Sequence, residues 1–293
     1  MPSVEYHDEI SRRCQNIHAI PKMGSNELQG AGVCQPGSVP VLCYHSVDPA
    51  WESPLAMTPE GFAEHCAWLS RSRTVVPVDV LVPRAAEGRR SAGPEVAITF
   101  DDGFAAVHQH ALPVLRRHRL PTAMFLVART LHDGSVQDAP ARADWLRPQP
   151  PVGPKTLSLQ QVLELRDAGM QAGSHSWAHA DLTTLSEAEC IRDLRESREL
   201  LEDLLRQPIT MLAYPYGFHS PHVRRAAAAA GYEYALALPE GPEPDGTYAV
   251  PRVGIYRRNG VMSLQVKCSR WYLGARQSRG YARRRGAAAR PKG

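Results

Sequence analysis

Two adjacent carboxylates are the first residues in this chain whose types and spacing could do chemistry. Asp101 and Asp102 follow the apolar run 96–98 and precede Gly103, so a strand that ends at this glycine could turn both side chains toward one pocket. Two like charges this close raise the pKa of one carboxyl unless a cation compensates, which is a physical reason to expect a metal. Taken alone, the Asp-Asp-Gly sequence is equally well explained as a simple turn.

A pair of histidines favours the metal interpretation over the turn. His175 and His179 are four residues apart, and two imidazoles at this spacing, on a helical turn or a tight loop at a strand end, can converge on one ion. Position 176 is a serine, so the pattern lacks the glutamate that serves as general base in HExxH metalloproteases. Asp101 is then the candidate base. The two motifs together predict a metal-dependent hydrolase.

An α/β fold with a largely parallel sheet must position these groups, because short β-branched runs alternate with helical patterns from residue 39 onward. The expected strands are 39–44, 74–78, 95–100, 122–127, 170–174, 210–214, 232–238 and 249–256. About that many strands suit a closed or partly closed barrel. Catalytic groups in such sheets gather beyond the carboxyl ends of the strands, which is where both motifs lie.

Helix start signals separate several of the expected strands. The signals are Thr58 before Pro59, Ser158 with Gln161 three residues on, and Ser220 before Pro221. Residues 186–205 predict the longest helix, with an apolar stripe for the core opposite a densely charged face.

Composition and charge indicate a folded, soluble protein. The 293 residues are 43% hydrophobic and 22% charged, which argues against disorder and fibrous structure. The net charge of +4 arises from basic residues after position 275, so it does not indicate a nucleic-acid partner. The six cysteines form no CxxC pair and are expected to be buried thiols.

The two ends of the chain differ from its middle. No apolar run in residues 1–38 is long enough for a signal peptide or a membrane span, which predicts a cytoplasmic protein. We expect an N-terminal extension over 1–38, one catalytic domain over 39–270 and a basic, disordered tail over 271–293. The oligomeric state stays open.

Three motifs in order give the chain a resemblance to a known family. Residues 99–103 (TFDDG), 174–179 (SHSWAH) and 213–217 (AYPYG) resemble the motifs of the polysaccharide deacetylases, which share the chitooligosaccharide deacetylase homology domain and form carbohydrate esterase family 4. The resemblance spans residues 39–256. It implies a distorted (β/α) barrel of about seven repeats. It also implies metal-assisted hydrolysis of an N-acetyl group on a sugar.

The resemblance implies a role for each motif residue. The expected ligands of one divalent cation are Asp102, His175 and His179. One carboxylate and two neutral imidazoles leave coordination positions open, as a catalytic site requires, and they favour Zn²⁺, with Ni²⁺ or Co²⁺ able to substitute. Asp101 would be the general base. The backbone N–H of Tyr216, oriented by the rigid Pro215, would stabilise the oxyanion.

Two positions depart from the family pattern. Many members carry an arginine that orders the base at the first position of the third motif, where this chain has Ala213, and we predict that Arg252 replaces it. Many members also protonate the leaving amine with a late histidine, but no histidine follows Val253 here. His45, within residues 43–47 (CYHSV), resembles the histidine given this role in the permuted branch that acts on poly-N-acetylglucosamine, and is the predicted general acid.

The substrate and the reaction leave alternatives open. The expected substrate contacts are Pro215, Tyr216, Trp177 and His219, although Trp177 could instead pack beneath the metal. The leading hypothesis is a deacetylase of an N-acetylated sugar or glycan precursor. A second hypothesis keeps the site but acts on a small N-acyl amine or cyclic imide. A third is a non-catalytic sugar-binding or scaffolding protein, favoured by the missing third-motif arginine.

Overall fold

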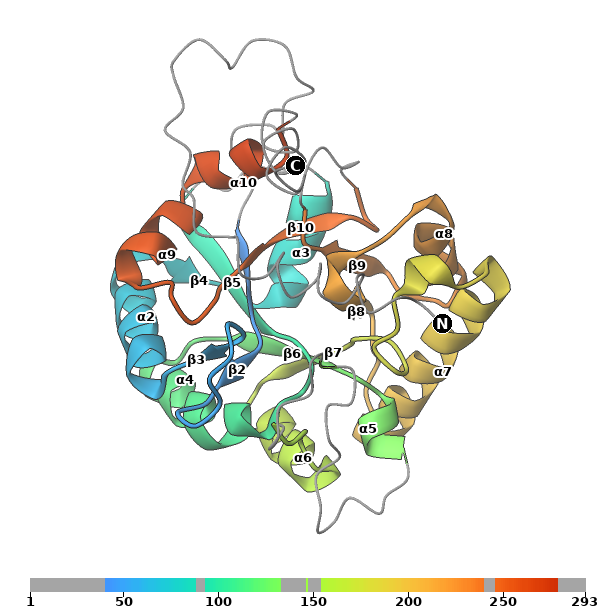
Figure 1. Cartoon of the computed structure of the whole chain (residues 1–293), viewed down its shortest axis with the longest axis horizontal. Coiled ribbons are helices and arrows are strands. Elements are labelled where there is room, and N and C mark those ends of the chain that lie inside the picture. Colours follow the sequence, from blue (N-terminus) through green and yellow to red (C-terminus); the bar gives the residue numbers. More distant parts are fainter. Residues whose placement is uncertain (1–39, 88–92, 133–145, 147–153, 240–245, 279–293) are drawn as a thin grey trace, which may run out of the picture.

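In the part of the chain that the structure describes, seven parallel strands close into a barrel surrounded by helices (Figure 1). The computed structural model describes residues 40–87, 93–132, 146, 154–239 and 246–278. The barrel strands are β1 (Val41–Tyr44), β5 (Glu95–Phe100), β6 (Thr122–Leu126), β7 (Gln171–Ser174), β8 (Met211–Ala213), β9 (Tyr234–Ala237) and β10 (Val250–Gly254). Neighbours in the ring are consecutive from β5 to β10, and β1 closes it by pairing with both β10 and β5.

The predicted α/β barrel is therefore confirmed, with differences at its edges. The second expected strand is only β4 (Thr74–Val75), which pairs with β5 outside the ring. Pro77 ends this segment, and helix α3 (Val78–Ala86) begins directly after it. Helix α3 was not predicted from the sequence, and neither were the two-residue strands β2 (Ser46–Val47) and β3 (Ala56–Met57), which pair with each other.

The predicted helix starts are observed. The remaining helices are α2 (Pro59–Ser72), the π-helix η1 (Val107–Ala111), α4 (Leu112–His118), α5 (Arg129–His132), α6 (Leu159–Asp167), η3 (Leu182–Thr184), α7 (Glu187–Leu205), η4 (Pro215–Gly217), α8 (Pro221–Ala229), α9 (Val261–Lys267) and α10 (Arg270–Arg276). Thr58 and Ser220 cap α2 and α8, and Ser158 completes a capping box at α6. Ser186 forms the same kind of capping box with Glu189 at the start of α7.

Alternation along the strands divides the core into two layers. One cluster lies between the barrel and its outer helices, and the second contains alternate strand residues such as Val41, Ala97 and Phe125. Three buried residues of α3 join this inner cluster: Val78, Leu81 and Val82. Because the inner residues include the first positions of β1, β8 and β10, α3 closes the barrel at the amino ends of its strands. Burial of each such side chain stabilises the fold by about 1.5–3 kcal/mol.

The ends of the chain lie largely outside the described residues, among them the predicted extension 1–38 and most of the predicted tail. Helix α10 occupies the start of that tail, and its Leu273 is buried, so the packed part of the chain extends beyond residue 270. The described cysteines are buried and free, as expected: Cys43, Cys66, Cys190 and Cys268. Within the described ranges, no helix has the length and apolar character needed to cross a membrane.

Candidate active site

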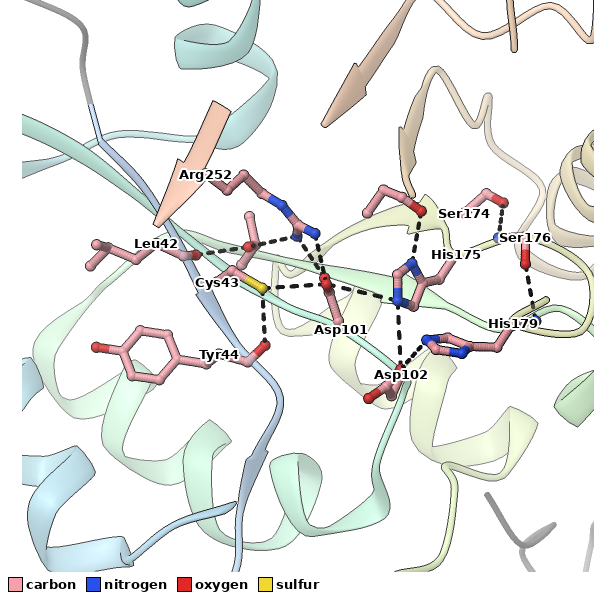
Figure 2. A network of polar contacts seen from close by, with 12 residues as sticks. Leu42, Cys43, Tyr44, Asp101, Asp102, Ser174, His175, Ser176, His179 and Arg252 are labelled. Atoms are coloured by element: carbon pink, nitrogen blue, oxygen red, sulfur yellow. Dashed lines mark hydrogen bonds and ion pairs between the residues drawn. The ribbon is translucent and has the colours of Figure 1, made fainter. Parts of the chain in front are cut away.

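The carboxyl ends of four barrel strands bring the predicted chemical groups together (Figure 2). Asp101 and Asp102 follow β5, His175 follows β7, His45 follows β1, and Arg252 lies within β10. All of these side chains except His45 are buried. Residues as far apart in the sequence as His45 and Arg252 therefore share one small volume at the end of the barrel opposite α3.

Asp102, His175 and His179 form a compact set of donor atoms. The Asp102 Oδ1 atom lies 3.5 Å from His175 Nε2 and 3.2 Å from His179 Nε2. Donor atoms of the three residues all lie within 4.8 Å of one another, and each residue is at most 6% exposed. This spacing suits ligands that converge on one ion.

The polar atoms of this set fit a cation in two ways. Asp102 Oδ1 is buried and has no hydrogen-bond partner among the described residues, although buried carboxylate oxygens are normally compensated. His175 Nδ1 lies 2.7 Å from the carbonyl oxygen of Ala213, which can only accept, so Nδ1 carries the proton and Nε2 presents its lone pair. Burial lowers the pKa of His175 to about 4, so its imidazole is neutral at pH 7, as a metal ligand must be.

Asp101 is held by the chain itself. Its Oδ1 and Oδ2 atoms each lie 2.7 Å from an Arg252 guanidinium nitrogen, and the Cys43 thiol donates to Oδ2 at 3.3 Å. Burial disfavours the charge on Asp101, but Arg252 and then His175 more than offset it and hold the pKa below its ordinary value. Since His175 is neutral at pH 7, the lasting positive charge is that of Arg252.

Arg252 reaches Asp101 from inside the barrel. Its guanidinium lies over the Phe125 ring at 5.5 Å and within 3.4 Å of the Thr99 hydroxyl. The side chain of Arg252 is completely buried and that of Asp101 is 2% exposed. The structure thus places the arginine predicted from sequence against the carboxylate that it was expected to orient, although it comes from a different strand than Ala213.

His45 lies beside Asp101 at the edge of the site. One of its ring nitrogens, the Cys43 sulfur and an Asp101 oxygen all lie within 4.8 Å of one another. Its ring stacks on Tyr256 with centroids 6.5 Å apart, and its buried Nδ1 has no hydrogen-bond partner in the described ranges. This group is a poor second metal site, because Arg252 occupies both Asp101 oxygens and burial raises the pKa of the Cys43 thiol.

The third motif contacts the set of donor residues, Asp102, His175 and His179, through Tyr216. Its ring lies 4.6 Å from that of His179 in an edge-on arrangement, and its backbone is left-handed at φ 58°. Gly217 follows at φ 74°, and a Cβ there would lie 2.5 Å from Leu238, so only glycine fits this turn. Pro215 precedes the tyrosine and is buried.

Left-handed backbone is concentrated in the three motifs. The motif residues other than glycine with positive φ are Asp102, Ser176, His179 and Tyr216. Only two further described non-glycine residues share this conformation, Arg119 and Arg206, and both lie at helix C-termini. Strained backbone persists where the surroundings enforce it, which is common at functional sites.

Two predicted substrate contacts face neighbours within the chain. Trp177 is half-buried, and its ring packs against that of His132 at 5.0 Å. His219 stacks on Tyr214 at 5.2 Å, and its Nδ1 lies 3.0 Å from an Arg224 guanidinium nitrogen. Packing accounts for both side chains in the structure, and their contact with substrate stays a prediction.

Several residues that touch the site were not predicted from the sequence. Cys43 and the Ala213 carbonyl contact Asp101 and His175, and Asp193 and Ser197 of α7 contact the loop that carries both histidines. A signal existed for Ser197, because it is a polar residue in the apolar stripe of α7 and is fully buried. A backbone carbonyl gives no such signal.

Comparison with known sequences gives a family match over half of the chain. Residues 88–235 match the family model described as polysaccharide deacetylase. YxkH of Bacillus subtilis is 24% identical over 226 residues, which are 75% of this chain and 72% of that protein. The poly-β-1,6-N-acetyl-D-glucosamine N-deacetylase of Staphylococcus aureus is 22% identical over 169 residues, and the chain spans 53% of its length.

Solved structures share the barrel. The Streptococcus pyogenes deacetylase PplD, solved in complex with acetate, superposes with a TM-score of 0.67 at 19% identity, covering 79% of this chain and 98% of that one. IcaB from Ammonifex degensii superposes with a TM-score of 0.61 at 23% identity, covering 80% of this chain and 97% of that one. At these identities the likeness demonstrates a common fold.

Proposed function

The chain belongs to the polysaccharide deacetylase family and is a deacetylase-type hydrolase, and from this premise we propose that one divalent cation held by Asp102, His175 and His179 serves its reaction. The substrate we propose is an N-acetyl group on a glycan or glycan precursor. The observation that carries the proposal is the buried Asp102 Oδ1, which faces two imidazole Nε2 atoms and has no hydrogen-bond partner among the described residues.

The donor set supports Zn²⁺, because one carboxylate and two imidazoles suit borderline cations. When bound, such a cation supplies Lewis acidity for the acetyl carbonyl and for the attacking water. His175 is prepared for this role by the Ala213 carbonyl, which fixes its tautomer, and by burial, which keeps it neutral.

Asp101 is the proposed general base. Arg252 binds both of its oxygens, which fixes the carboxylate plane and keeps the group ionised near neutral pH. Asp101 Oδ2 lies 3.8 Å from His175 Nε2, so the base stands next to the ligand set without belonging to it. An ionised carboxylate in this place can accept the proton of a water molecule that attacks the substrate.

The remaining steps fall to His45 and Tyr216. His45 lies beside Asp101, so in its protonated form it can donate to the amine nitrogen as that group leaves. Tyr216 lies against His179, where its backbone N–H is the proposed donor to the developing oxyanion. The arginine missing from the third motif no longer favours a non-catalytic protein, because Arg252 provides the same charge at Asp101.

Acetate release tests the proposal directly. Zinc-loaded wild-type protein and the Asp101→Asn variant would be incubated with N-acetylglucosamine oligomers of β-1,6 and β-1,4 linkage and with small N-acyl amines. We expect zinc-dependent acetate release from a glycan, and its loss in Asp101→Asn with the metal retained. Turnover of the small N-acyl amines alone would show that the site acts on another class of substrate. Glycan binding without turnover by the zinc-loaded protein would contradict an enzymatic role.

A further inference from the structure

The loop that carries both histidine ligands adopts a conformation that it would not choose by itself. Between His175 and His179, Ser176 has φ 67°, and His179 itself has φ 55°. Neither residue is a glycine, so the left-handed backbone costs free energy at both positions. Other parts of the protein must therefore enforce the loop geometry that sets the distance between the two imidazoles.

The peptide groups at the centre of the loop are held from two sides. The Trp177 N–H donates to Asp193 Oδ1 of helix α7 at 3.0 Å. The Trp177 carbonyl accepts from the Arg129 N–H at the start of α5 at 2.8 Å, and the Ser176 carbonyl accepts from the Ala128 N–H at 3.1 Å. Trp177 is thus fastened between α5 and α7 by its backbone, independently of its indole.

A second contact from α7 holds the beginning of the loop. Ser197 Oγ lies 2.7 Å from Ser174 Oγ, and Ser174 Oγ accepts from the Ser176 N–H at 3.1 Å. The Ser176 hydroxyl in turn accepts from the His179 N–H at 3.0 Å, as Figure 2 shows. A chain of hydrogen bonds therefore runs from α7 to the backbone of the second ligand.

Helix α7 is built to present these two groups. Asp193 and Ser197 are four residues apart and so share one face of the helix. The neighbouring Leu194 and Leu201 are fully buried against the barrel, and the Leu194 carbonyl accepts from the Tyr232 hydroxyl at 3.0 Å. The helix can neither rotate nor slide without losing this packing.

We propose that Asp193 and Ser197 are positioning residues that hold the loop 174–179 in its ligand-binding conformation and thereby set the affinity for the divalent cation. The inference rests on the proposed function, since it assumes that His175 and His179 are ligands. Partners that orient metal ligands from outside the coordination sphere typically change metal affinity by about 10–100-fold when they are removed.

Metal affinity across matched variants tests this role. Zinc binding would be measured by competition with a chelating dye, and amide hydrogen exchange would be followed at residues 176–179. We expect Asp193→Ala to lower zinc affinity by about 10-fold or more. Asp193→Asn should stay within about threefold of wild type, because its amide oxygen can still accept the Trp177 N–H. Ser197→Ala should fall between the two.

A control on the same helix separates local from global effects. Glu199→Ala lies on the exposed face of α7 and should leave both zinc affinity and exchange unchanged. The Trp177 amide should exchange slowly in wild type and in Asp193→Asn but faster in Asp193→Ala, also without zinc. If Asp193→Ala does not fold, Ser197→Ala tests the contact of α7 with Ser174, and a zinc affinity equal to that of wild type would overturn the role of Ser197.

The outcomes distinguish this inference from the proposed function. Equal zinc affinity and equal Trp177 exchange in wild type and Asp193→Ala would overturn the positioning role alone. Equal losses in Asp193→Asn and Asp193→Ala would also overturn it, because the hydrogen-bond acceptor would then not be the feature that matters. A wild-type protein that binds no divalent cation would overturn the proposed metal site itself.

Discussion

Asp101 and Asp102 are neighbours in the chain and are both buried, yet their carboxylates are compensated in opposite ways. Asp101 accepts from Arg252 with both oxygens and from Cys43 with one. Asp102 directs its Oδ1 at two imidazoles and finds no hydrogen-bond partner for that atom in the described part of the chain. The charge of Asp101 is compensated by Arg252, whereas Asp102 faces the two imidazoles of the proposed cation site.

The backbone explains how adjacent residues reach such different surroundings. Asp101 continues the alternation of β5 and points with Thr99 toward Arg252 inside the barrel. Asp102 has φ 69° and Gly103 has φ 68°, so the chain leaves the strand in a left-handed turn. That turn directs the second carboxylate toward the histidines of the next motif instead of the opposite face of the strand. The proposed base and the proposed metal ligand can thus be adjacent in sequence.

The largest expected effect comes from exchanging the two carboxylates for amides. Asp102→Asn should lower zinc affinity by at least about 100-fold, because it removes the only charged ligand. Asp101→Asn should keep the metal but lose about 10²–10⁴-fold in kcat, the usual contribution of a general base. Metal content by mass spectrometry and kcat for acetate release would be measured on both variants. Loss of zinc from both, or from neither, would erase the distinction between them.

A substitution of His45 tests the proposed proton donor to the leaving amine. His45→Gln should lower kcat by about 100-fold and remove the alkaline limb of the pH–rate profile, because the leaving amine would lose its proton donor. Zinc content should not change, since His45 lies beside Asp101 and outside the ligand set. An alkaline limb identical to that of wild type would exclude His45 as the acid.

A substitution of Arg252 tests whether the guanidinium compensates the buried charge of Asp101. Arg252→Met should destabilise the fold by about 3–5 kcal/mol, because it leaves a buried carboxylate without its partner. Asp101→Asn combined with Arg252→Met should recover part of this loss, since neither charge then remains. Urea unfolding of the metal-free proteins would measure both effects. A single variant as stable as wild type would show that Asp101 does not depend on the guanidinium.

Acidic pH tests how the buried imidazoles of His65 and His175 contribute to stability. The Nδ1 atom of His65 lies 3.1 Å from the Tyr44 hydroxyl. Burial lowers the pKa of both His65 and His175 to about 4. The unfolded chain, with a histidine pKa of about 6.5, therefore binds more protons between pH 6.5 and 4. Stability from each group is complete above that range and is lost as the pH falls through it, by up to about 3 kcal/mol.

Unfolding of the metal-free protein at several pH values would measure this slope. His65→Gln and His175→Gln should each flatten the dependence of stability on pH between pH 6.5 and 4. Asp101→Asn should change that slope only below this window, because the pKa of the Asp101 carboxyl is already depressed. A slope that neither histidine variant alters would assign the acid sensitivity to other groups.

The smallest effect is expected at Cys43. Its thiol is a weak donor, and Arg252 still holds both Asp101 oxygens without it, so Cys43→Ala should change kcat less than about fivefold and stability by about 1 kcal/mol. Cys43→Ser should retain the contact. A loss as large as that of Arg252→Met would show that the thiol, and not the guanidinium, controls the base.

Local patterns in the chain were sufficient for much of this structure. The alternation of apolar runs and helix caps predicted the strands of the barrel and the starts of α2, α6, α7 and α8, because propensity and capping act within a few residues. The same patterns placed Asp101, Asp102 and the two histidines at one edge of the sheet, since parallel strands share their carboxyl ends. The short β2 and β3 were missed because their signals span too few residues. Helix α3 was missed because no side chain caps its start at Pro77 and Pro83 lies inside it.

What the tertiary structure alone decided is the direction of each group. The family resemblance paired Arg252 with Asp101 and grouped Asp102 with His175, but no local pattern shows these directions, because they depend on where β5, β10 and β7 lie once the ring is closed. The support of the histidine loop by α7 is likewise a contact between segments that meet only after packing. Residue types and their spacing determined which chemistry is available to this protein, and barrel closure decided which carboxylate Arg252 compensates and which faces the two histidines.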